Sequence, residues 1–319
     1  MKNKKSLLLF FLKILVGIGL IVWLVAKGNL DFSFVGKILK DPIRLTLASL
    51  AHLFVLFLLF FRLKLLLFSK KISLTFWRAI SLGFVGQFFS TVLPGAVTGD
   101  VFKAFYIKKD YPALSKKFLF FILLVDRLLG LTALFLIAAS SSLFFYSDIL
   151  EKYPVLLPMV KIFLGIGGSL LFLFFVYLLM PSNLKWHSSF LNKLWEVLKF
   201  KKIIFQTILI SCVIQGSAIW IFWYLLFPMS EGTLTLELAY LFAPIGFLST
   251  VLPISPAGLG VGHTVFETLF TFVKIPHGAS LYNVYFLFGV FWNLTGFFFY
   301  LTYKDSSPSD GQLHPPLFE

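Results

Sequence analysis

The stretch Phe88-Phe-Ser-Thr-Val-Leu-Pro94 occurs a second time, almost unchanged, as Phe247-Leu-Ser-Thr-Val-Leu-Pro253. Six of the seven positions are identical, and in both copies a glycine follows five residues after the proline, at Gly99 and Gly258. A match of this length, with the glycine spacing kept, indicates an internal repeat. In membrane proteins, two interrupted apolar segments at corresponding positions are the best sequence indication of a substrate site.

The composition indicates a polytopic membrane protein. Of the 319 residues, 59% are hydrophobic and 13% are charged, against about 25% charged residues in ordinary soluble domains. The net charge of +14 comes from Lys and Arg residues that separate apolar runs, and not from a basic domain with interleaved aromatic residues. We therefore expect no nucleic-acid partner. We expect a single transmembrane domain over residues 1–305 and a polar, disordered tail over residues 306–319.

Apolar runs of about 20 residues are needed to cross the hydrocarbon core of a bilayer. Two shorter apolar segments, at about 79–107 and 238–273, break in the middle at Pro and Gly, as re-entrant helical hairpins do. We therefore predict an all-α polytopic membrane protein with two re-entrant hairpins and about six full transmembrane helices. The predicted full spans are 6–26, 45–61, 118–140, 156–180, 203–227 and 280–303.

The distribution of Lys and Arg predicts the orientation. With both termini in the cytoplasm and each hairpin returning to its own side, 18 of these residues lie inside, including those of a loop over residues 62–78, and 7 lie outside. If the first hairpin were a single span, 11 would lie inside and 14 outside. Cytoplasmic loops carry the positive excess, so the count favours the hairpin. Since three spans separate the hairpins, they enter from opposite faces as an inverted repeat, either re-entrant or fully crossing.

The segment from Leu184 to Leu198 alternates apolar and basic residues with helical periodicity. Leu191, Leu194 and Trp195 share one face, and lysines occupy the opposite face. This pattern predicts an amphipathic helix that lies on the anionic cytoplasmic leaflet.

Asp126 and Arg127 lie about nine residues into a predicted span, or roughly 13 Å at 1.5 Å per residue. Each charge at such a depth costs about 2.5 to 3.5 kcal/mol on insertion scales, so both side chains should face the bundle interior or a cavity. Adjacent helical residues do not face each other, so each charge needs a partner elsewhere. Two roles stay open: direct contact with a substrate, or a structural ion pair that holds a hairpin in place.

The tip and second arm of the first hairpin carry glycines and charges. Gly95 and Gly99 allow close backbone approach, and Asp100 suits the N-terminus of a helix. That terminus together with Lys103 favours an anion, and in a bilayer the obvious anion is a lipid phosphate. In the alternative, Asp100 only caps the helix and Lys103 extends to the interface.

The second hairpin places His263 and Glu267 four residues apart, on one helical face. We expect a hydrogen-bonded pair that lines the cavity. One His beside one carboxylate makes a poor metal site, and we expect neither a metal nor a cofactor. The glycines of this hairpin match no nucleotide-binding fingerprint and suit a close-packed turn. The candidate hinges are the Pro and Gly residues of both tips: Pro94, Gly95, Gly99, Pro253, Pro256, Gly258 and Gly260.

Three motifs follow one another along the chain: Leu93-Pro-Gly-Ala-Val-Thr-Gly-Asp-Val-Phe-Lys103, Asp126-Arg-Leu-Leu-Gly130 and Ser255-Pro-Ala-Gly-Leu-Gly-Val261. Together they resemble the transmembrane region of the lysylphosphatidylglycerol synthase/flippase family, whose stand-alone members lack the soluble aminoacyl-transferase domain. The resemblance covers about residues 6–303. It implies a lipid-flippase fold of two inverted repeats with re-entrant helices. The family commonly has an arginine where this chain has Lys103 and a glutamate where it has His263, so the resemblance does not identify the lipid.

We therefore predict a non-enzymatic lipid translocase of the plasma (inner) membrane, which moves a phospholipid or another polar-headed lipid between leaflets. Two alternatives stay open: an accessory or scaffold protein for a lipid synthase or glycosyltransferase, and a membrane-embedded enzyme that acts on lipid-linked substrates. A lipid-modifying enzyme as partner and a homo-oligomer are both compatible with the sequence. The expected substrate-binding residues are the ionisable ones of the hairpins and of the span between them: Asp100, Lys103, Asp126, Arg127, His263 and Glu267.

Overall fold

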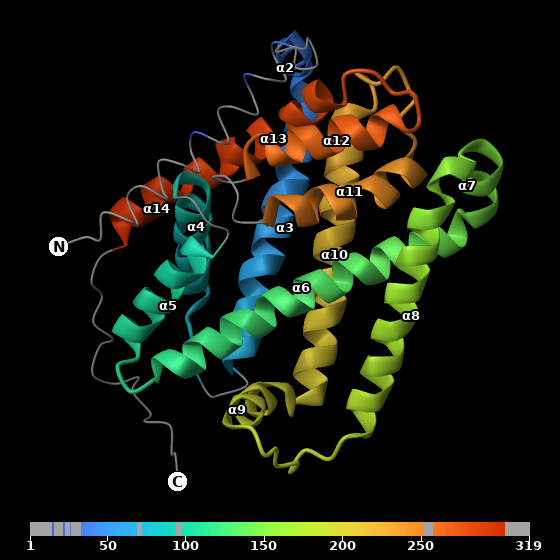
Figure 1. Ribbon diagram of the computed structural model, residues 1–319. Coiled ribbons are helices and arrows are strands. Elements are labelled where there is room, and N and C mark those ends of the chain that lie inside the picture. The colour runs from blue at the N-terminus through green and yellow to red at the C-terminus, as the bar shows by residue number, and fades with distance from the viewer. Residues whose placement is uncertain are drawn as a thin grey trace.

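The computed structural model describes residues 33–68, 72–93, 97–251 and 258–303, together with the single positions Leu15, Val22 and Ala26. All regular structure in these ranges is helical (Figure 1). Five helical segments are long and apolar enough to cross a membrane, which confirms the all-α membrane fold and five of the six predicted spans. The sixth span, 6–26, and the tail, 306–319, lie outside the described ranges. The five segments are Pro42–Phe68, Lys116–Phe144, Pro154–Leu179, Lys201–Leu226 and Gly278–Thr302.

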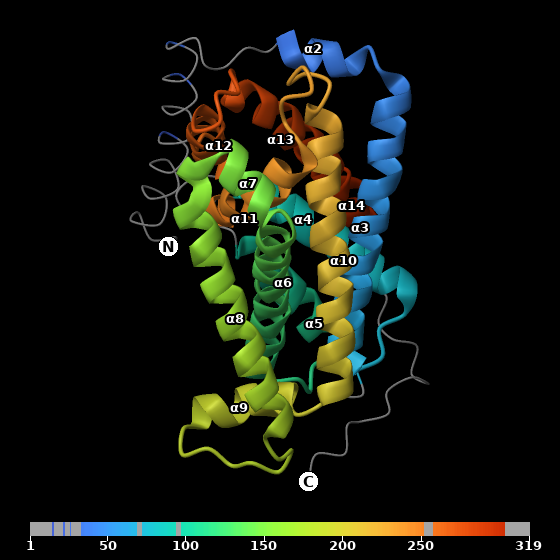
Figure 2. The same cartoon turned by 90° about the vertical axis from the view of Figure 1, so that its right-hand side faces the viewer.

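Four long helices form the frame of the molecule: α3 (Pro42–Phe68), α6 (Lys116–Phe144), α8 (Leu157–Leu179) and α10 (Lys201–Leu226). Helix α10 packs along α3, and α6 packs against both α10 and α8. These helices are apolar around most of their circumference, as expected where one side meets protein and the other meets lipid. The short helices α2 (Ser33–Leu39) and α9 (Ser189–Leu198) lie at opposite ends of this frame, and α7 (Tyr146–Lys152) follows α6 (Figures 1 and 2).

Each copy of the repeated stretch ends one arm of a pair of short helices. Helix α4 (Phe76–Val92) packs against α5 (Thr98–Asp110), and α11 (Leu236–Val251) packs against α12 (Val261–Thr271). The longest of these arms has 17 residues, or about 25 Å at 1.5 Å per residue, which is less than the roughly 30 Å of a hydrocarbon core. The predicted broken segments are therefore present at the predicted positions.

The first break has a local cause. Leu93, at the end of α4, has extended backbone angles, φ −98° and ψ 141°. A residue before proline is driven to this region, and proline itself cannot donate the next helical hydrogen bond. Four of the seven tip residues that we named as hinges lie outside the described ranges: Pro94, Gly95, Pro253 and Pro256.

The glycines five residues after each proline serve different purposes. A Cβ on Gly99 would lie 2.1 Å from the carbonyl oxygen of Gly86, so this glycine lets α5 approach α4. Gly258 instead has a φ of +72°, and Gly260 has a φ of +79°, a region that favours glycine. The two glycines therefore occupy equivalent positions in the repeat, but Gly99 lies in a helix and Gly258 has a positive φ.

The last span is divided into α13 (Gly278–Leu294) and α14 (Gly296–Thr302). Helix α13 packs against α12, and α14 packs against α4. The span therefore begins beside the second hairpin and ends beside the first (Figure 1).

Two boundary predictions are wrong. Helix α3 continues to Phe68, so Arg62 lies inside a helix and is only 5% exposed, rather than in a cytoplasmic loop. The residues after Arg62, up to Phe68, are apolar except for Lys64, which also lies in this helix. Without Arg62 and Lys64, 16 of the 18 predicted inside charges remain, against 7 outside. The predicted amphipathic helix begins at Ser189, not at Leu184, and it buries Trp195.

Candidate functional site: an apolar groove with a buried ion-pair cluster

Asp126 and Arg127 have separate partners, as their helical positions require. Asp126 accepts two hydrogen bonds from Arg62 on α3, from Nε at 2.8 Å and from Nη2 at 2.9 Å. Arg62 also donates from Nη1 to Ser211 Oγ on α10, at 2.9 Å. Because Asp126 is 7% exposed and its pair with Arg62 is bidentate, this carboxylate joins α6 to α3 rather than facing a ligand space.

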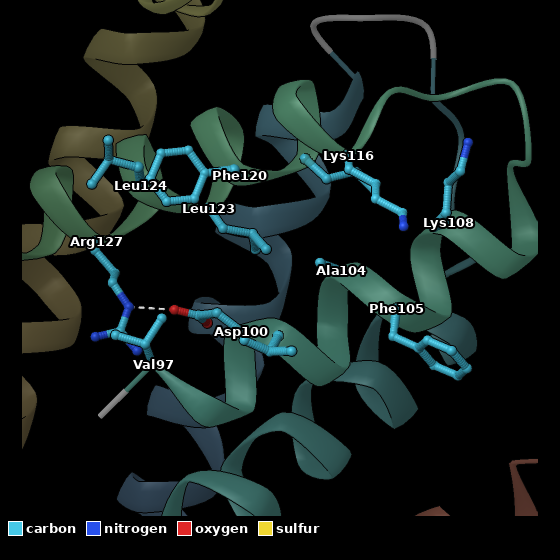
Figure 3. Close-up of a pocket in the computed structure, with 12 residues that line it drawn as sticks. Val97, Asp100, Ala104, Phe105, Lys108, Lys116, Phe120, Leu123, Leu124 and Arg127 are labelled. Atoms are coloured by element: carbon cyan, nitrogen blue, oxygen red, sulfur yellow. Dashed lines mark hydrogen bonds and ion pairs between the residues drawn. The ribbon is translucent and has the colours of Figure 1, made fainter. Parts of the chain in front are cut away.

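Arg127 points the other way, toward the first hairpin. Its guanidinium forms an ion pair with Asp100 in the first turn of α5, drawn as a dashed line in Figure 3. Asp100 also accepts from Lys103 Nζ at 3.2 Å. The Arg127 side chain is 31% exposed, against 12% for Asp100 and 10% for Lys103. Arg127 is therefore the most accessible member of a cluster in which one carboxylate faces two cations.

Lys103 depends on a second glycine of the first hairpin. A Cβ on Gly86 would lie 2.3 Å from Lys103 Cε, so the lysine stem lies directly against the α4 backbone. Lys103 is 8% exposed, and its ammonium donates to Asp100 inside the protein. This buried position does not favour the alternative role, in which the ammonium extends to the membrane surface. The sequence gives no periodic signal that marks Gly86 as the residue that makes this room.

A groove of about 420 Å³ runs between α5 and α6. The Asp100–Arg127 pair lies at one end, and Lys108 and Lys116 lie at the other (Figure 3). The wall between the two ends is apolar. It consists of Val97, just before α5, of Val101, Ala104 and Phe105 on α5, and of Leu119, Phe120, Leu123 and Leu124 on α6.

The predicted pair of His263 and Glu267 is wrong, because each side chain bonds to α13 instead of to the other. His263 is fully buried, and its Nε2 lies 3.1 Å from Asn283 Oδ1. Glu267 Oε2 accepts from the backbone N–H of Ala279, at 2.7 Å, in the first turn of α13. Neither residue lines the α5–α6 groove. A carboxylate at a helix N-terminus is stabilising. His263 and Glu267 therefore hold α12 against α13 through two separate contacts.

The outer ends of the first hairpin carry a cluster that sequence reasoning missed. Arg78, near the start of α4, forms an ion pair with Asp110 at the end of α5, with Nη2 and Oδ1 2.6 Å apart. Tyr303, just after α14, donates to Asp110 at 3.3 Å, and the Arg78 guanidinium lies 3.6 Å from the centre of its ring. Arg78 and Tyr303 are 32 and 193 residues from Asp110 in sequence, so no spacing rule could have grouped them.

Within the described residues, no group of three or more His, Cys, Asp or Glu side chains could hold a metal ion. The fold and this site define the class: a multi-pass helical membrane protein with buried charges along a groove between two of its helices.

The family is shown by comparison with known proteins. A family model described as the lysylphosphatidylglycerol synthase TM region matches residues 10–301, most of the chain, and the protein belongs to this family. Comparisons with curated proteins and with solved structures gave no match.

Proposed function

We propose that the protein is a lipid translocase that moves a phosphate-bearing lipid between the leaflets of the plasma membrane. The observation that carries the proposal is the cluster of Asp100, Lys103 and Arg127 at the end of an apolar groove. Membership of a family named for a lipid synthase supports a lipid-related role for the membrane region.

The charges of the cluster favour a monoanionic group. One carboxylate and two cations leave a formal charge of +1, which one phosphodiester would neutralise. Asp100 would then act as the internal anion that holds Arg127 when no lipid is bound, and a lipid phosphate would exchange with it. Arg127 suits this exchange because a guanidinium binds carboxylate and phosphate with the same fork of donors.

Alternating access would come from the two hairpins, as re-entrant elements of an inverted repeat. The outer ends of α4 and α5 contact Tyr303 at the end of the last span. The outer part of α12 contacts Ala279 at the beginning of that span. Since this span is long enough to cross the bilayer, the arrangement supports hairpins that open toward opposite faces, with the Gly residues of the tips as hinges.

Proteoliposomes with fluorescent phosphatidylglycerol and phosphatidylcholine test the proposal. We expect the wild-type protein to move the anionic probe between leaflets faster than protein-free liposomes do. Arg127→Gln should slow this movement about tenfold or more, because a hydrogen bond to a charged group contributes about 1.5–3 kcal/mol. Asp100→Asn should also slow lipid movement, because no internal anion would then displace the bound phosphate. For the same reason, it should raise the apparent affinity of the protein for the anionic lipid.

Asp148→Asn is the matched control, since Asp148 is an exposed carboxylate on α7, remote in sequence from the cluster. It should leave lipid movement unchanged. A wild-type protein that moves no lipid would contradict the proposal, and so would Arg127→Gln and Asp100→Asn variants that fold and move lipid at the normal rate.

A further inference from the structure

We infer that the groove between α5 and α6 binds one acyl chain of an anionic phospholipid, with the lipid phosphate at Lys108 and Lys116. This inference rests on the proposed function for its occupant and adds which part of the lipid binds, where it binds and in which direction. The Arg127–Asp100 pair then closes the far end of the groove, where the methyl end of the chain would lie (Figure 3).

The shape of the groove fits a chain that enters sideways from the bilayer. Its floor is buried, with Leu119 1% exposed and Leu123 5% exposed. Its rims are open, with Val101 and Phe105 each 61% exposed and Phe120 56% exposed. A solvent-facing apolar surface of this kind would mark a membrane or ligand contact, and its volume is within the roughly 300–1,000 Å³ of small-molecule sites.

The apolar wall alone cannot select a lipid. Lipid tails are as apolar as leucine, so a chain that moves from the bilayer into the groove gains packing contacts but little hydrophobic free energy. Discrimination must therefore come from the polar ends of the groove, where charged side chains can meet a head group.

The end at Lys108 and Lys116 has positive charge without an acidic partner. Lys108 Nζ donates to the backbone carbonyls of Pro112 and Leu114, the latter at 2.5 Å, and these acceptors are neutral. Lys116 is exposed, and no described Asp or Glu forms a salt bridge with either lysine. Basic residues at a membrane surface attract anionic lipids, so this end fits a phosphate.

The two ends are separated by a distance that suits a chain. Lys116 and Arg127 are eleven residues apart on α6, or roughly 16 Å at 1.5 Å per residue. A lipid whose phosphate lies at Lys116 would therefore extend its chain past Phe120 and Leu123 toward Arg127. The head group would reach the inner cluster only in a later step of translocation.

The test is photo-crosslinking of the full-length protein in lipid nanodiscs, read out by peptide mass spectrometry. The probe is phosphatidylglycerol with a diazirine at a defined carbon of one acyl chain. A diazirine near the glycerol should label the Leu119 to Phe120 region, and one near the methyl end should label the Leu123 to Arg127 region. Labelling that does not change with diazirine position would overturn the inferred direction.

Two sets of variants test the charges and the wall separately. Lys108→Gln combined with Lys116→Gln should lower groove labelling by the anionic probe about tenfold, and Lys117→Gln, the neighbouring exposed lysine outside the groove, should leave it unchanged. Ala104→Trp should fill the groove and abolish labelling without changing any charge. Unchanged labelling in both the double lysine variant and Ala104→Trp, with both folded, would overturn the site, and equal labelling by a phosphatidylcholine probe would overturn the anionic preference.

The outcome is separable from that of the translocase proposal. Groove labelling without lipid movement in proteoliposomes would leave the binding site standing and contradict the translocase. Lipid movement without groove labelling would support the translocase and contradict the groove as the binding site.

Discussion

At the residue scale, two neighbours on α6 have opposite environments. Asp126 is held by a bidentate pair with Arg62, which is itself fixed by Ser211, so this side chain has little freedom to change partner. Arg127 is one-third exposed and borders the groove. Of the two roles that the sequence leaves open for these charges, the geometry favours a structural clamp for Asp126 and keeps ligand contact as the proposal for Arg127.

The pair of Arg62 and Asp126 gives a stability prediction. Arg62→Met should lower the stability of the folded protein by about 3–5 kcal/mol, because it leaves the Asp126 carboxylate buried without a partner. Adding Asp126→Leu should recover most of this loss, since an apolar pair of similar volume can replace a buried ion pair at little cost.

Unfolding of the detergent-solubilised protein, followed by tryptophan fluorescence, would measure both variants. Lipid movement in the double variant should stay near the wild-type rate, because neither residue lines the groove. A single Arg62→Met variant as stable as the wild type would contradict the structural role.

At the element scale, the first hairpin depends on close backbone contact between its arms. Gly99 on α5 faces the carbonyl oxygen of Gly86 and the hydroxyl of Ser90 on α4. Lys103, one turn further along α5, lies over Gly86. The position of the Asp100 cluster relative to α6 therefore depends on how closely α5 sits against α4.

Gly99→Ala should separate the two arms. Its Cβ would lie 2.1 Å from a backbone oxygen, and such overpacking typically costs about 1–3 kcal/mol. We expect faster amide hydrogen exchange over residues 98–110 and slower lipid movement. Gly165→Ala on α8 is the matched control, because its Cβ would have no atom within 4 Å. Equal exchange in the two variants would show that close approach at Gly99 does not hold the hairpin.

At the scale of the whole molecule, the proposed inverted repeat predicts the sides on which two loops lie. Lys109 is at the outer end of the first hairpin, and Glu231 is in the turn before the second. Cys212 is the only cysteine of the chain, so Cys212→Ser provides a cysteine-free background. A membrane-impermeant maleimide should then label a cysteine at position 231 from outside intact cells and one at position 109 only after permeabilisation. Labelling of both from the same side would contradict the inverted repeat.

The sequence alone was sufficient for the approximate positions of the five described spans and of the helix ends that precede the two breaks. Both are local properties: the length of an apolar run decides whether a helix can cross, and the missing N–H of proline decides where it stops. The repeated Ser-Thr-Val-Leu-Pro therefore predicted where α4 and α11 end, to within about two residues. The same local reasoning showed that Asp126 and Arg127 each need a partner.

Only the tertiary structure decided which partners these are. Arg62 is 64 residues from Asp126, and Asp100 is 27 residues from Arg127, so each pairing depends on which helix faces meet. The same applies to His263 and Glu267, whose four-residue spacing predicted a hydrogen bond between the two side chains. In the structure α13 packs against α12, and it provides Asn283 as the partner of His263 and Ala279 as the partner of Glu267. The groove arises in the same way. One wall belongs to α5, an arm of the first hairpin, and the other to α6, a full span, and no sequence pattern relates the residues of the two walls.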